Sequence, residues 1–226
     1  LSSHELNMPG AYKEVKDTTV VALFKVIKND QSSFLFDDPN DDVRIAAWTT
    51  TPWTLPSNTA LCAGPDISYI KIKTSNPYTH TPVSVVLAEA LVPNWFGGKN
   101  QSTVEGQSAA FKGSKMKGIR YEPLLDFGNE IEPLLGGTDA YLVLTGDHVT
   151  TSDGTGIVHT APSFGADDQR VAKANGVGTL TLVDQTGKFK ENVGPYSGRY
   201  VKDYKDEPGY VAVDIDIAIQ LKTEGK

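Results

Sequence analysis

The feature that most constrains the fold of this chain is a series of short runs rich in β-branched residues, separated by glycine, proline, asparagine and aspartate. Such runs predict strands joined by turns, and here they cover residues 19–26, 44–48, 67–73, 83–87, 140–144, 156–159 and 179–183. Helical periodicity is rarer and predicts helices at residues 88–95, 166–175 and 213–222. We therefore expect a β-rich α+β fold with a barrel-like sheet at its core and peripheral helices.

Composition narrows the class of protein. A chain of 226 residues that is 39% hydrophobic can bury a proper core, and we expect residues 29–42 and 93–107 to be loops or insertions rather than domain boundaries. A net charge of −7 disfavours autonomous binding of a polyanion. No apolar run reaches the roughly 20 residues of a membrane span, and residues 1–6 do not resemble a signal peptide. We therefore expect a cytoplasmic protein without a membrane partner.

Cysteine and histidine usage bears on metals and redox chemistry. Cys62 is the single cysteine, so an intrachain disulfide and a cysteine-rich zinc site are excluded. The histidines show no spacing typical of helical metal ligands, and they are His4, His80, His148 and His159. We expect no metal and no cofactor.

A threonine-rich stretch at residues 48–58 reads Trp-Thr-Thr-Thr-Pro-Trp-Thr-Leu-Pro-Ser-Asn. Threonines favour strands and could simply be packing there. However, Pro52 and Pro56 prevent the stretch from continuing as a central strand. A turn at this point would expose several hydroxyls and backbone amides to one small volume. Such a volume can hold an ester carbonyl, a ribose hydroxyl and a water molecule.

A second dense stretch, residues 154–168, reads Gly-Thr-Gly-Ile-Val-His-Thr-Ala-Pro-Ser-Phe-Gly-Ala-Asp-Asp. Its glycines do not form a phosphate-loop pattern and are better explained as a turn before a short strand. A hydrolase triad with Ser163 or a threonine as nucleophile, His159 as base and Asp168 as orienter is a weak candidate, because no nucleophile-elbow sequence is present. Asp167 and Asp168 fall in the first turn of a predicted helix, where carboxylates are common for structural reasons alone.

The two stretches together closely resemble the editing domain inserted in class I aminoacyl-tRNA synthetases, specifically that of the isoleucyl-tRNA synthetase family. The valyl and leucyl relatives usually carry Thr-Thr-Arg-Pro where this chain has residues 49–52, and Lys or Met where it has His159. One departure is Ser163-Phe164, where many relatives have Gly-His or Ala-His. The signatures His-Ile-Gly-His and Lys-Met-Ser-Lys-Ser are absent from the sequence. We therefore expect residues 1–226 to be a single editing domain excised from a larger synthetase, without the aminoacylation domain.

The resemblance implies post-transfer editing, in which a positioned water hydrolyses the ester of mischarged Val-tRNA(Ile) and releases valine. A single missing methylene is worth only about 1–3 kcal/mol, a limit for which this synthetase family is itself the standard example, so a second, smaller pocket is needed. The implied partners are the valine-charged 3′ end of tRNA(Ile) and the remainder of the synthetase in cis. The alternative is a non-catalytic module that binds the tRNA acceptor end and has kept the editing fold.

The resemblance also assigns residue roles. Asp168 would bind the α-ammonium of the substrate, with a general-base role as the alternative. His159 and Trp53 would line the amino-acid pocket, although His159 could instead carry a proton. The remaining roles are ester, water or ribose contacts for Thr50 and Thr51, substrate binding for Thr49, an adenosine contact for Asn58, and a helix-start or surface position for Asp167.

Overall fold

The computed structural model describes residues 7–12, 17–99, 101–202 and 209–226, so His4 lies outside the described residues. Within them the chain forms a mixed sheet of nine strands. The strands are β1 (Val20–Lys25), β2 (Val43–Thr49), β3 (Ala60–Ala63), β4 (Ser68–Ser75), β5 (Pro82–Ala88), β6 (Gly106–Gln107), β7 (Phe111–Lys112), β8 (Leu142–Thr145) and β9 (Ile157–Thr160). The expected β-rich α+β fold is confirmed.

Strand β2 organises the sheet because it pairs with strands along both of its edges. It runs antiparallel to β1 over the whole length of β1, from Val20 opposite Thr49 to Lys25 opposite Arg44. On its other edge the first half pairs in parallel with β5, and Trp48 near its end pairs in parallel with Val158 of β9. The strand order is β6-β4-β5-β2-β9-β3-β8. The end of β2 and the end of β9 therefore lie side by side.

The main core lies against one face of this sheet. It includes Phe24, Ile45, Val86 and Ile157 from the sheet, all at most 2% exposed. Tyr121 from a connecting segment packs edge-on against Phe24, with ring centroids 5.3 Å apart. A smaller apolar cluster occupies the other face of β2, β4 and β5. The sheet is thus apolar on both faces, as expected for strands that are covered on both sides.

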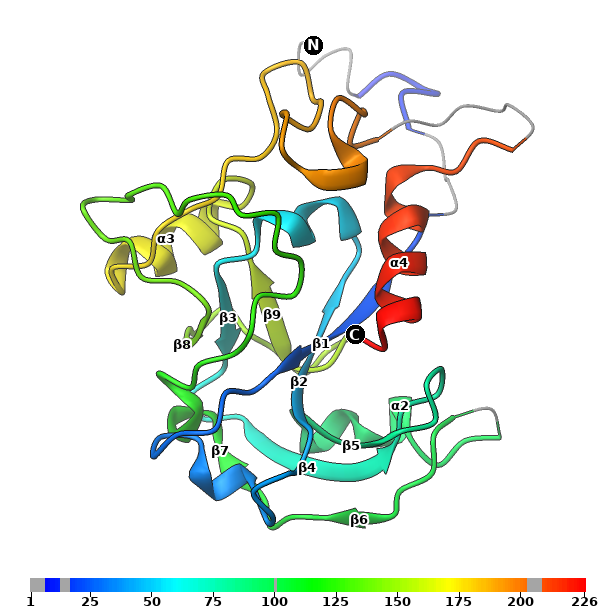
Figure 1. Cartoon of the computed structure of the whole chain (residues 1–226), viewed down its shortest axis with the longest axis vertical. Coiled ribbons are helices and arrows are strands. Elements are labelled where there is room, and N and C mark those ends of the chain that lie inside the picture. Colours follow the sequence, from blue (N-terminus) through cyan, green and yellow to red (C-terminus); the bar gives the residue numbers. More distant parts are fainter. Residues whose placement is uncertain (1–6, 13–16, 100, 203–208) are drawn as a thin grey trace.

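The helices lie at the periphery of the sheet (Figure 1). They are α2 (Val92–Trp95), α3 (Ala166–Ala174) and α4 (Val213–Glu224). Short 3₁₀ helices are η1 (Ser33–Leu35), η2 (Pro52–Ser57), η3 (Glu89–Leu91), η4 (Gly113–Met116) and η5 (Gly194–Tyr196). No helix in the described ranges is long and apolar enough to cross a membrane.

Most predicted strands are confirmed, but the one at residues 179–183 is wrong. Thr179 and Val183 make only isolated bridges, to Glu132 and Phe189. Leu180 and Leu182 are nevertheless buried in the core. Alternate burial produces the same sequence pattern in an extended segment without a continuous ladder of hydrogen bonds. Conversely, β3 was missed because Ala60–Ala63 is buried at every position and shows no alternation.

The predicted helices had mixed outcomes. The predictions at residues 166–175 and 213–222 match α3 and α4. The prediction at residues 88–95 is correct only in part, since Ala88 still belongs to β5 and the rest divides into η3 and α2. The loops predicted at 29–42 and 93–107 also contain short elements, namely η1, the end of α2 and β6.

Candidate functional site

The two motif stretches meet at the end of β9. The first stretch leaves β2 at Thr49 and turns into η2, which begins with Pro52 at its first position. The second stretch forms β9 and then the start of α3. Hydrogen bonds from Thr54 and Asn58 reach His159 across more than a hundred residues of sequence. The expectation that prolines turn the threonine run out of the sheet is confirmed.

His159 is held by both ring nitrogens. Nε2 lies 2.9 Å from Thr54 Oγ1, and Nδ1 lies 2.9 Å from Asn58 Nδ2. The Asn58 amide also donates to the carbonyl of Ala60 at 2.8 Å, and since a carbonyl can only accept, this contact fixes the orientation of the amide. Nδ1 of His159 must therefore accept a hydrogen bond, and its proton must reside on Nε2.

A fixed chain of donors follows from this tautomer. The hydroxyl of Tyr121 donates to Asn58 Oδ1 at 2.7 Å. At the other end, His159 Nε2–H donates to Thr54 Oγ1, whose own hydroxyl donates to the carbonyl of Thr51 at 2.8 Å. His159 is only 7% exposed, and burial lowers its pKa to about 4. The imidazole is therefore neutral at physiological pH.

The threonines are ordered by this network to different degrees. The hydroxyls of Thr49 and Thr51 lie 3.3 Å apart, and the Thr51 amide donates to Thr49 Oγ1 at 3.1 Å. Thr49 and Thr54 are buried, Thr51 is half-buried and Thr50 is exposed. Among the threonines of this stretch, Thr50 and Thr51 can therefore reach a ligand directly.

Asp168 is attached to the same end of β9. Its Oδ2 accepts the backbone N–H of Ala161 at 2.9 Å, two residues after His159. Asp168 is half-buried, and burial raises its pKa above the ordinary value of 3.8, an effect only partly offset by the Ala161 bond. A carboxylate in this environment gains from a cationic partner, because desolvation strengthens an ion pair.

Asp167 differs from Asp168 although the two are adjacent. Its side chain is 65% exposed and lies 3.1 Å from Arg170 one turn along α3. This is an ordinary pair on a helix surface, worth a few tenths of a kcal/mol. The surface position expected for Asp167 is confirmed.

Trp53 joins η2 to the segment before α3. Its ring packs edge-on against that of Phe164, with centroids 4.9 Å apart. Its backbone N–H donates to Asp214 Oδ1 of α4 at 2.7 Å, and Asp214 is itself paired with Lys202. Trp53 and Phe164 are both half-buried. Their rings therefore form an aromatic pair between η2 and the start of α3.

Asn58 does not occupy the position expected for an adenosine contact. It is 3% exposed, and its amide is used within the protein by Ala60, His159 and Tyr121. Sequence reasoning included Thr54 in the threonine run but gave it no role of its own, and it missed Tyr121. Nothing in the local sequence linked Tyr121 to Asn58. Among the described residues, no group of three or more potential ligands could hold a metal ion.

Comparison with known proteins identifies the sequence. No protein-family model matches it. It is 44% identical over 232 residues to the isoleucine–tRNA ligase of Porphyromonas gingivalis, covering 97% of this chain and 19% of that protein. It is 45% identical over 219 residues to the isoleucine–tRNA ligase of Bacteroides fragilis, covering 92% and 18%. The chain belongs to the isoleucine–tRNA ligase family.

The family relatives are much longer than this chain, which spans about a fifth of their length. In solved structures the fold matches the cytosolic leucyl-tRNA synthetase editing domain of P. knowlesi, with a TM-score of 0.60, 11% identity, and coverage of 91% of this chain and 92% of that one. At this identity the likeness establishes the fold alone. This member of the isoleucine–tRNA ligase family therefore has the fold of a synthetase editing domain.

Proposed function

We propose that residues 1–226 form the editing domain of a longer isoleucine–tRNA ligase and hydrolyse the ester of Val-tRNA(Ile). The observation that carries the proposal is the joining of both motif stretches at the end of β9 by His159, Thr54 and Asn58. The family match and the editing-domain fold support the same reaction class. The aminoacylation domain would lie in the rest of the polypeptide, and tRNA(Ile) would be the partner, in the cytoplasm.

Asp168 is the proposed anchor for the α-ammonium of the substrate. One of its oxygens is already held by the Ala161 amide, which aims the carboxylate without satisfying all of its acceptor sites. Its partial burial strengthens a contact with a cation relative to one in water. This pairing would fix the orientation of the ester relative to the threonines.

Thr50 and Thr51 are the proposed contacts for the ester, the ribose and the attacking water. Both side chains are accessible, unlike those of Thr49 and Thr54. In the reaction, the water oxygen adds to the ester carbonyl, the bond from that carbon to the ribose oxygen breaks, and the ribose oxygen takes up a proton. No covalent enzyme intermediate is needed, because the ester is already activated.

His159 is assigned to the wall of the amino-acid pocket rather than to proton transfer. Both of its ring nitrogens are engaged, and a pKa of about 4 leaves it neutral at physiological pH. A buried ring that is hydrogen-bonded at two atoms cannot shift easily to make room. It can therefore exclude a side chain one methyl group larger than valine. Asn58 is assigned to holding this ring, and Trp53 to the same pocket.

The test compares single variants of the full-length synthetase in single-turnover deacylation. Wild-type enzyme should hydrolyse Val-tRNA(Ile) much faster than Ile-tRNA(Ile). Asp168→Ala should lower the rate at least about 30-fold, because truncating one partner of a desolvated charge pair costs roughly 2–5 kcal/mol. Asp167→Ala is the matched control and should change the rate less than about twofold.

Two outcomes would contradict the proposal. Normal deacylation by the Asp168→Ala variant would show that Asp168 does not contact the substrate. Binding of Val-tRNA(Ile) by the wild-type enzyme without any turnover would instead support a non-catalytic module that binds the acceptor end.

A further inference from the structure

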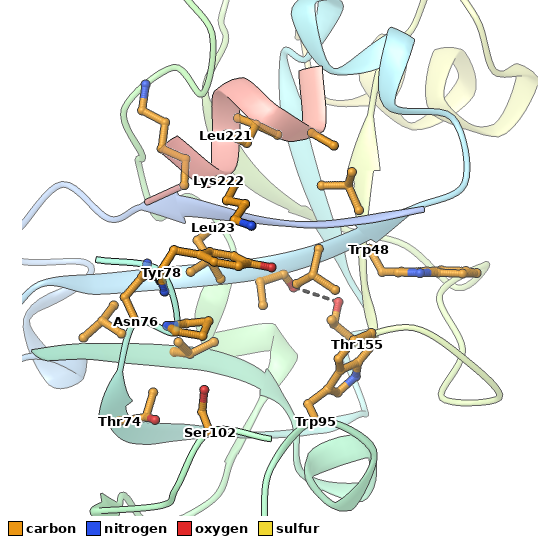
Figure 2. Close-up of a pocket in the computed structure, with 18 of the residues that line it drawn as sticks. Leu23, Trp48, Thr74, Asn76, Tyr78, Trp95, Ser102, Thr155, Leu221 and Lys222 are labelled. Carbon is orange, nitrogen blue, oxygen red and sulfur yellow. Dashed lines mark hydrogen bonds between the residues drawn. The ribbon is translucent and has the colours of Figure 1, made fainter. Parts of the chain in front are cut away.

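A groove lies over the smaller apolar cluster of the sheet, and Figure 2 shows residues that line it. Its volume is about 490 Å³, and none of the site residues assigned above lines it. The floor is formed by alternate residues of three strands. Leu23 of β1, Ala46 of β2 and Val85 of β5 face the groove, whereas their neighbours in each strand face the core.

Helix α4 forms one wall of this groove and is apolar on two opposite sides. Val213, Ile217 and Leu221 are at most 1% exposed and pack into the main core. Ile215 and Ile219, offset by half a turn, are 43% and 51% exposed and line the groove. A helix with apolar residues on both sides is typical of one that is buried on both sides. The outer stripe of α4 therefore lacks a cover within the described residues.

The chemistry of the groove favours polypeptide over nucleic acid. Trp95 and Phe96 join the aliphatic side chains of the strands in the lining, and most of the lining residues are apolar. The rim cations are already engaged: Lys222 lies over the ring of Tyr78 at 4.9 Å, and Lys226 donates to the carbonyl of Leu124 at 2.9 Å. With a net charge of −7, the chain offers little here for a phosphate backbone.

We propose that this groove is the docking surface for an apolar segment from the remainder of the synthetase polypeptide. About four-fifths of the length of the family relatives lies outside the region that this chain matches. A segment of the same polypeptide docks in an intramolecular step, so a groove of modest size can hold it when the connection spans the distance. The inference rests on membership of the family and is independent of the hydrolytic function.

The first test places a photo-crosslinking residue in the groove of the full-length enzyme. Ile219→benzoylphenylalanine should cross-link, on irradiation, to a peptide of the same polypeptide outside residues 1–226, identified by mass spectrometry. The control site is Leu135, which is 80% exposed and does not line the groove. A cross-link to tRNA, to a second copy of the enzyme or to nothing would overturn the proposal.

The second test replaces Ile219, one residue of the outer apolar stripe of α4, by a charged residue. If the groove is covered, Ile219→Asp buries a carboxylate without a partner, and backbone hydrogen exchange in α4 and β1 should accelerate at least about tenfold. Leu135→Asp should leave exchange in these elements unchanged. Equal exchange in both variants would show that Ile219 faces solvent in the full-length enzyme and would overturn the proposal.

Discussion

The side-chain amide of Asn58 lies 2.9 Å from Nδ1 of His159, and Asn58 also donates to the carbonyl of Ala60. This relationship fixes the tautomer of a buried histidine without any charged partner. The hydrogen bond from the Tyr121 hydroxyl to Asn58 Oδ1 holds the Asn58 amide in this orientation. The arrangement keeps the imidazole of His159 neutral at physiological pH, as the proposed role in the wall of the amino-acid pocket requires.

Asn58→Asp should reverse the polarity of this contact. A carboxylate oxygen facing Nδ1 can only accept, so His159 should take up a proton on Nδ1 and its pKa should rise. The carbonyl of Ala60 would lose its donor, which should lower the free energy of unfolding by about 1–3 kcal/mol. ¹⁵N NMR of the imidazole reports the tautomer directly. An unchanged Nε2–H tautomer in the variant would contradict the assignment.

Stability should depend on pH through His159. Its pKa is lowered from 6.5 to about 4 in the folded protein, so between these values the unfolded state binds the proton and the folded state does not. The contribution of His159 to stability is complete above pH 6.5 and is lost as the pH falls towards 4, by up to ~3 kcal/mol. Urea unfolding at a series of pH values from 7 to 4 measures how the free energy of unfolding depends on pH. His159→Gln should reduce this dependence. A histidine that titrates near pH 6.5 in the folded protein would refute it.

Tyr121→Phe should weaken the support of His159 by removing the hydrogen bond to Asn58. Tyr121 is 1% exposed. Removing its hydroxyl leaves Asn58 Oδ1 buried without a donor, which should lower the free energy of unfolding by about 1–3 kcal/mol. Discrimination between Val-tRNA(Ile) and Ile-tRNA(Ile) should fall as the His159 ring loosens. Tyr141→Phe, whose ring lies 6.2 Å from that of Tyr121, serves as the control. Equal effects of the two substitutions would mean that the hydroxyl plays no specific part.

Deacylation should require the ionised form of Asp168. Burial raises the pKa of this carboxyl, so the acidic limb of the rate profile should have its midpoint above pH 3.8, with no further step from His159 between pH 5 and 8. Asp168→Asn should lose activity while remaining at least as stable as wild type at pH 7, because it removes a half-buried charge and keeps an acceptor for Ala161. A marked loss of stability in Asp168→Asn would indicate a structural role.

The strand-rich class, the turn at Pro52 and the start of α3 could be predicted from the sequence, because they depend on local backbone preferences and on alternating burial. The sequence also supplied the family through two motifs. It did not reveal β3, whose residues are buried on both faces and show no periodicity. Conversely, alternate burial led to the prediction of a strand at residues 179–183, where there is only an extended segment with isolated bridges.

The surroundings of the motif residues follow from the packing of distant segments. The protonation of His159 depends on Asn58 and Tyr121, which come from distant segments, and on burial. The difference between Asp167 and Asp168 depends on which side of α3 faces the Ala161 amide. Hydrogen-bond direction and desolvation are properties of neighbours in space. A sequence motif shows which chemical groups are present, whereas packing determines their protonation state and their accessibility to a ligand.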